Sequence, residues 1–194
     1  MLQIRFHGRG GQGVVSAAEM LAIAAFAEGK YAQAFPSFGS ERMGAPVTSY
    51  CRINDEPIRL REPILNPDIV VVQDPTLLHE RKLLEGLIAT GYVLLNSSHS
   101  WEHAPDGASK LDRNHVCSVP ATEIALRHLG KPFPNTVLLG GLAAFTGAVR
   151  LESLCCAIRS KFSAELAQRN IAAATEAFEF VTQAAPHVLE PAPC

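Results

Sequence analysis

The chain has 194 residues, of which 47% are apolar, so it can bury one substantial core and is expected to form one domain or at most two. Its 17 Lys and Arg nearly balance its 19 Asp and Glu, which argues against nucleic acid as the main partner, because phosphate backbones usually require a basic face. No apolar run reaches the roughly 20 residues that a membrane span needs, and Met1 leads into a predicted strand without a signal peptide, so we expect a cytoplasmic location.

The chain begins with a strand, a glycine-rich loop and a helix. Residues 2–6 form a short apolar strand, a glycine-rich stretch follows, and an alanine-rich helix is predicted over Val14–Ala27. Gly8, Gly10 and Gly13 match the spacing G-x-G-x-x-G, and the helix N-terminus after such a loop offers free N–H groups. The full dinucleotide fingerprint also needs an acidic residue at the end of the second strand. Here that strand, residues 31–35, runs into Pro36 without one. The loop therefore has two open interpretations, a tight turn at a protein interface and an anion site.

The next loop, residues 36–46, has the composition of a recognition surface. It is punctuated by glycine and proline, carries a Glu-Arg pair, and exposes an aromatic and a methionine side chain. We therefore expect the glycine-rich loop and this loop to form contacts with partners. The residues expected there are Gly8, Gly10, Gly11, Gln12, Gly13, Phe38, Gly39, Glu41, Met43 and Gly44.

The middle of the chain predicts further strands with one helix between them. Residues 47–53 and 58–60 flank a turn and are interpreted as a hairpin appended to the sheet. The β-branched run 69–72 is typical of a strand covered on both faces. A helix is expected over residues 77–89, followed by strands at 92–96 and 116–120. The resulting fold class is α/β, with a mostly parallel sheet, Rossmann-like βαβ units and C-terminal helices.

The last third is predicted to be helical. One apolar stripe comprises Leu151, Leu154, Cys155, Ile158 and Phe162, and a second comprises Ala167, Ile171, Ala174, Phe178 and Val181. Both follow helical spacing and are suited to packing against another helix or a second subunit. We expect one domain over residues 1–185 and an irregular, proline-rich tail over 186–194.

No set of residues in the chain forms a complete catalytic apparatus. His99 and His103 stand four apart, but the surrounding residues indicate a solvated loop, so no metal site is predicted. The adjacent Cys155 and Cys156 lie on a predicted amphipathic helix, where at least one should belong to the core. The five cysteines show no C-x-x-C spacing, which favours reduced thiols and argues against an iron–sulfur cluster held by this chain alone. The serines lack a G-x-S-x-G elbow.

Five segments, taken in order, carry a family resemblance that spans nearly the whole chain. They are residues 8–13, 31–47, 68–74, 131–140 and 151–154. Together they resemble the gamma subunit of pyruvate:ferredoxin oxidoreductase and of related 2-oxoacid:acceptor oxidoreductases. The chain is accordingly identified as a gamma-type domain of that family.

The resemblance implies one piece of an oligomer that decarboxylates a 2-oxoacid on thiamine diphosphate with magnesium. Such complexes pass electrons through 4Fe–4S clusters, commonly to ferredoxin, and in most members the acyl group ends on coenzyme A. These cofactors belong to alpha, beta and delta-type subunits, so the gamma chain is expected to hold none of them and to contribute no catalytic residue.

The resemblance further implies that this domain packs beside the active site and helps to form the coenzyme A region. Arg42, Lys131 and Asn135 are the candidates for phosphate or amide contacts there, because Arg and Lys stabilise phosphate oxygens by charge-assisted hydrogen bonds. Relatives often have Arg where this chain has Met43, which leaves one fewer cation in the loop.

Several alternatives stay open at this stage. Within the family, an aryl or indole 2-oxoacid such as phenylglyoxylate could replace pyruvate, and an NAD-linked partner could replace ferredoxin. From other classes come a stand-alone nucleotide-binding module that uses the glycine-rich loop, and a structural interaction subunit without any ligand.

Overall fold

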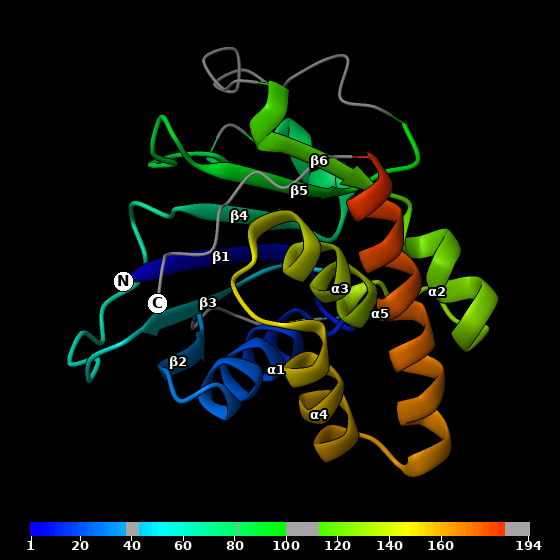
Figure 1. Ribbon diagram of the computed structural model, residues 1–194. Helices are drawn as coiled ribbons and strands as arrows, with labels where there is room; N and C mark the ends of the chain where they lie inside the picture. Colours follow the sequence, from blue (N-terminus) through cyan, green and yellow to red (C-terminus); the bar gives the residue numbers. More distant parts are fainter. Residues whose placement is uncertain (38–42, 81, 100–112, 185–194) are drawn as a thin grey trace.

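The computed structural model describes residues 1–37, 43–80, 82–99 and 113–184. Within these ranges one sheet has six strands in the order β2-β3-β1-β4-β5-β6 (Figure 1). β1, β4, β5 and β6 are parallel neighbours, whereas β3 is antiparallel to both β1 and β2, so the mostly parallel α/β fold is confirmed. The strands are β1 (Leu2–Arg9), β2 (Tyr31–Pro36), β3 (Pro46–Asn54), β4 (Ile69–Val72), β5 (Tyr92–Asn96) and β6 (Val116–Val119).

The α-helices of the described chain gather on one face of the sheet (Figure 1). They are α1 (Val14–Ala27), α2 (Ala121–Leu129), α3 (Asn135–Thr146), α4 (Leu151–Lys161) and α5 (Ala164–Ala184). Ile69 and Val71 of β4 point into the core that these helices cover, while Val70 and Val72 belong to a second cluster on the opposite face. Side chains alternate across a strand, so a fully β-branched β4 is explained by the burial of both faces.

The opposite face is covered without the helix predicted over residues 77–89, and that prediction is wrong. A short 3₁₀ helix, η1 (Pro75–His79), begins at Asp74, and turns follow it up to β5. Leu77 and Leu83 still reach the second cluster. Arg5 donates from Nη2 to the carbonyl oxygens of Leu83 and Glu85, both at 2.8 Å. The two carbonyl oxygens thus accept hydrogen bonds from a buried guanidinium, whereas in a helix they would accept from backbone N–H groups four residues further along the chain. Tertiary contacts therefore override the local helix pattern.

The appended hairpin is present, but its second arm is not the predicted one. Residues 58–60 form no strand. Over residues 49–53, β3 pairs with β1 on one edge and with β2 on the other, so a strand at 58–60 has no free edge of β3 there to pair with. The hairpin is instead the β2-β3 pair, whose strands are joined through the loop 37–45.

The predicted first helix and the C-terminal stripes are confirmed. α1 spans the predicted residues and ends just before Gly29, which has a φ of +81°. It packs against β2 and β3 on one side and α4 on the other. In α4 and α5, Leu154, Ile158 and Val181 are fully buried. α3 lies at the centre of the helical layer, and every one of its residues is buried.

None of the helices in the described part of the chain combines the length and the apolar character that a bilayer crossing demands.

The cysteines and histidines that were weighed as redox or metal candidates lie as follows. Cys155 is buried and its neighbour Cys156 is exposed, as expected of an amphipathic helix. His99 is an exposed loop residue, and His103 lies outside the described residues.

Candidate functional site at the carboxyl edge of the sheet

The glycine-rich loop leads from the carboxyl end of β1 into the N-terminus of α1. Gly11 and Gly13 have φ values of +93° and +75°, a backbone region that L side chains rarely adopt. Gly13 is the N-cap of α1, and no side chain caps the helix there. Because the N-cap residue is a glycine, it covers none of the N–H groups at the start of α1 with a side chain of its own, which suits an anion site or a close interface.

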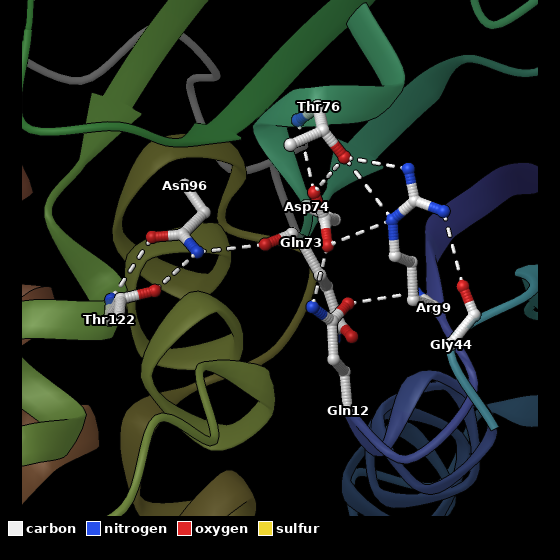
Figure 2. A network of polar contacts seen from close by, with 8 residues as sticks. All are labelled: Arg9, Gln12, Gly44, Gln73, Asp74, Thr76, Asn96 and Thr122. Atoms are coloured by element: carbon white, nitrogen blue, oxygen red, sulfur yellow. Dashed lines mark hydrogen bonds and ion pairs between the residues drawn. The ribbon is translucent and has the colours of Figure 1, made fainter.

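Polar side chains tie this loop to the carboxyl end of β4 (Figure 2). Gln12 accepts from the backbone N–H of Arg9 at 2.8 Å and donates from Nε2 to Asp74 Oδ2 at 2.8 Å. Arg9 Nε lies 3.3 Å from the same Asp74 oxygen. Burial alone would raise the pKa of Asp74, but hydrogen bonds from Thr76 and Gln12 and the charge of Arg9 bring its net pKa below the usual range. Asp74 is therefore a carboxylate at neutral pH.

A second polar contact closes the same edge one strand further along. Asn96, the last residue of β5, donates from Nδ2 to the carbonyl oxygen of Gln73 at 2.8 Å and to Thr122 Oγ1 at 2.7 Å (Figure 2). Its Oδ1 accepts from the backbone N–H of Thr122 at 3.0 Å. The ends of β4 and β5 and the start of α2 are thus fixed to one another.

The two predicted recognition segments lie against each other. Gly10 donates from its N–H to Ala45 O at 2.9 Å, and Gly44 donates to Gly10 O at 3.1 Å. The Met43 side chain is 91% exposed, and its sulfur lies close to Gly11. Phe38, Gly39, Glu41 and Arg42 lie outside the described residues. The antiparallel register of β1 and β3, which pairs Arg9 with Pro46, brings the two loops together.

A pocket of about 450 Å³ opens beside the glycine-rich loop. Gly11, Gln12 and Gly13 form one wall, and Lys131 and Asn135 line it from the α2–α3 connection and the start of α3. The structure thus brings two of the three predicted coenzyme A candidates to the glycine-rich loop. The third candidate, Arg42, is among the residues that the structure leaves undescribed.

The pocket is cationic, and α4 and α5 contribute cations that sequence reasoning missed. Lys161 and Arg169 line it together with Lys131, and no Asp or Glu is among its described lining residues. Lys161 pairs with Glu19, and Arg169 donates from Nε to the carbonyl oxygen of His128 at 2.8 Å. These contacts hold the two side chains at the pocket, and the chain order alone gave no signal of their proximity.

Asn135 is the most specific polar group of the pocket. Its residue is only 7% exposed, yet its side-chain amide makes no hydrogen bond to any described residue. A Cβ on Gly13 would lie 2.5 Å from Asn135 Nδ2, so the amide sits directly against the loop. The amide lines the pocket, so its donor and acceptor atoms are free to hydrogen-bond to a ligand there.

His7, at the start of the glycine-rich stretch, is held neutral. Arg5 donates from Nε to His7 Nε2 at 2.9 Å, which places the imidazole proton on Nδ1, toward Thr48 Oγ1 at 3.4 Å. Burial and the nearby Arg5 charge lower the pKa of His7 to about 3, from an ordinary value of 6.5.

This pKa predicts a loss of stability as the pH falls from 6.5 toward about 3, because the unfolded chain binds a proton there that the folded chain excludes. His7→Gln keeps an acceptor for Arg5 and removes the titration. Urea unfolding between about pH 7 and pH 5 should therefore give the wild type a steeper decline, by up to about 1.4 kcal/mol per pH unit. Equal slopes for the two proteins would contradict the prediction.

Comparison with known proteins shows which family the chain belongs to. Residues 3–180 match the family model described as pyruvate ferredoxin/flavodoxin oxidoreductase. The chain is 50% identical over 179 residues to the pyruvate/ketoisovalerate oxidoreductases common subunit gamma of Pyrococcus abyssi, covering 92% of this chain and 96% of that protein. It is 48% identical to pyruvate synthase subunit PorC of Methanothermobacter marburgensis, covering 92% and 97%.

A solved structure agrees with these relatives. The crystal structure of pyruvate oxidoreductase subunit PORC from Thermotoga maritima superposes with a TM-score of 0.78 at 40% identity, covering 92% of this chain and 95% of that one. The alignments run over nearly the whole of both chains. The chain therefore belongs to the pyruvate ferredoxin/flavodoxin oxidoreductase family, and its fold is that of the family's gamma-type subunits.

Proposed function

We propose that this chain is the gamma subunit of a thiamine diphosphate- and iron–sulfur-dependent 2-oxoacid:acceptor oxidoreductase, and that its pocket takes part of coenzyme A. The named relatives act on pyruvate or serve both a pyruvate and a ketoisovalerate enzyme, so pyruvate is the first substrate to test. The thiamine diphosphate and the clusters reside on partner alpha, beta and delta-type subunits, where they supply the decarboxylation and electron-transfer chemistry. Ferredoxin is the proposed acceptor and the cytoplasm the proposed location.

The observation that carries the coenzyme A proposal is the side-chain amide of Asn135, which lines a cationic pocket beside a helix N-terminus and makes no hydrogen bond to any described residue. Lys131 and Arg169 suit phosphate oxygens, which form charge-assisted hydrogen bonds with cations. The amide suits an uncharged acceptor or donor of the same ligand. Apolar Phe133 and Leu166 complete the wall, so the pocket fits an elongated ligand with both anionic and apolar parts.

The topology disfavours the alternative of a stand-alone dinucleotide-binding module. In the dinucleotide fold, the acidic residue that binds the ribose ends the strand beside the first one. Here β3 lies between β1 and β2, and β3 is antiparallel to β1. Pro36 ends β2 two positions away in the sheet, so an acidic residue there would not be at the ribose position. Failure of the isolated chain to bind NAD or FAD is the expected result.

Two variants of pocket residues test the coenzyme A proposal in the assembled complex. Lys131→Ala removes a cation, and Asn135→Asp is nearly isosteric but places a negative charge where the ligand phosphate or carbonyl would lie. Each should raise the KM for coenzyme A about tenfold, the size of one lost hydrogen bond to a charged group. Because electron transfer from the bound 2-oxoacid needs neither residue, kcat for viologen reduction should stay within about twofold of the wild type.

Lys82→Ala is the matched control, since Lys82 is an exposed cation outside the pocket. It should leave the KM for coenzyme A unchanged. If Lys131→Ala and Asn135→Asp also leave it unchanged, the pocket is no coenzyme A site, and the structural interaction subunit becomes the better interpretation.

A further inference from the structure

The Asp74 carboxylate contacts two separate segments, the glycine-rich loop and the start of η1 (Figure 2). Its Oδ1 accepts from the backbone N–H of Thr76 at 3.0 Å and from the Thr76 hydroxyl. Its Oδ2 accepts from Gln12 Nε2 at 2.8 Å and lies 3.3 Å from Arg9 Nε. The side chain is only 11% exposed. One carboxylate therefore connects the glycine-rich loop to the start of η1.

Arg9 links Asp74 and Thr76 to Gly44, which lies in the loop between β2 and β3. Its Nη1 donates to Gly44 O at 3.1 Å, while Nε and Nη2 donate to Thr76 Oγ1 at 3.2 Å and 2.8 Å. The Thr76 hydroxyl is thus a bridge, because it donates to Asp74 and accepts from Arg9. Backbone hydrogen bonds also link Gly10 to residues 44 and 45. We call the whole set of contacts among Asp74, Thr76, Arg9, Gln12 and these residues the joint.

Among the described residues, the groups paired with the Asp74 oxygens are the Gln12 amide, the Thr76 N–H and hydroxyl, and the Arg9 guanidinium, all of which carry N–H or O–H donors. A carboxylate accepts the three hydrogen bonds from Gln12 and Thr76 and pairs with the Arg9 charge, whereas an amide would turn a donor toward either Arg9 and Gln12 or Thr76. Asparagine therefore cannot replace aspartate without breaking the joint. The requirement for a charged acceptor distinguishes this arrangement from an ordinary helix-start cap, which asparagine satisfies equally well.

We propose that Asp74 is a positioning residue, which through Gln12 and Arg9 fixes the glycine-rich loop and residues 43–45 in one mutual geometry. Gly11, Gln12 and Gly13 are also one wall of the pocket, so the same joint sets the shape of the site. The kinetic consequence rests on the proposed coenzyme A function, whereas the effect on the two loops does not.

Hydrogen exchange on the full chain tests the positioning directly. In Asp74→Asn, the amides of Gly10 and Gly44, which link the two loops, should exchange about tenfold faster by NMR. Thr76→Val, which keeps the carboxylate but removes the bridging hydroxyl, should accelerate the same two amides and serves if Asp74→Asn fails to fold. Thr76→Ser retains the hydroxyl and should restore wild-type rates. Wild-type exchange at Gly10 and Gly44 in both Asp74→Asn and Thr76→Val would overturn the proposal.

Kinetics of the assembled complex separate this proposal from the proposed function. Faster exchange together with a severalfold higher KM for coenzyme A and an unchanged kcat for viologen reduction supports both. Faster exchange with an unchanged KM supports the positioning role of Asp74 and counts against the coenzyme A site. The Thr76→Ser complex, which keeps the hydroxyl, should match the wild type in both KM and kcat. A general loss of assembly would instead lower kcat.

Discussion

Gly140→Ala is expected to destabilise the chain by about 3 kcal/mol, in spite of a gain in helix propensity of about 1 kcal/mol. A Cβ at this position would lie 2.0 Å from Ala174 O and 2.7 Å from Ala174 C. These are backbone atoms of α5, so no side-chain rotation relieves the overlap and the two helices must separate. Urea unfolding of the purified chain measures the loss.

Gly141→Ala is the matched control in the same helix. Its Cβ would meet Val119 Cγ2 at 3.1 Å and Val181 Cγ2 at 3.5 Å, which are side-chain methyl groups that shift by a few tenths of an ångström. The gain in helix propensity offsets this shift, so the free energy of unfolding should stay within about 1 kcal/mol of the wild type. If Gly140→Ala and Gly141→Ala lower the free energy of unfolding equally, the close approach of α3 and α5 does not depend on a glycine at position 140.

Gly13→Ala should impair the pocket far more than it impairs folding. Its φ of +75° is costly for alanine by about 1 kcal/mol or more. The new Cβ would also lie 2.5 Å from Asn135 Nδ2, so the amide must leave its place. In the assembled complex we expect the KM for coenzyme A to rise about tenfold or more, with kcat for viologen reduction nearly unchanged.

Gly29→Ala controls for the backbone term of that prediction. Gly29 has a φ of +81°, but a Cβ there meets nothing within 4 Å. Its variant should lose about as much stability as Gly13→Ala while leaving the KM for coenzyme A unchanged. A similar rise in KM for both variants would mean that backbone strain in α1, and not the Asn135 contact, controls the pocket.

The elements with strong local signals could be predicted from the sequence. α1 has an apolar body and a glycine just past its end, and β4 is a continuous β-branched run, so both were placed correctly. Residues 77–89 show the limit. Their apolar spacing fits a helix, but the segment spreads over the sheet, and Arg5 takes the carbonyls of Leu83 and Glu85. No local pattern encodes a guanidinium from a strand almost 80 residues away.

The site divides in the same way. The glycine-rich loop and its uncapped helix follow from spacing alone, and family resemblance gave Lys131 and Asn135. Sequence reasoning did not single out Asp74, although it lies two residues past the end of the parallel strand β4. The rule that carboxyl ends of parallel strands share one edge of the sheet would have placed it beside the glycine-rich loop. Lys161 and Arg169 reach the pocket only through helix packing.

The most direct test of the proposed function is anaerobic purification of the tagged chain from its native cells, with identification of the copurifying proteins. The eluate is then assayed for viologen reduction with pyruvate, phenylglyoxylate and indolepyruvate, each with and without coenzyme A. We predict partner subunits that carry thiamine diphosphate and iron–sulfur clusters, and pyruvate-dependent reduction that requires coenzyme A. A colourless chain that elutes alone and reduces no viologen with any of the three 2-oxoacids would contradict the subunit assignment.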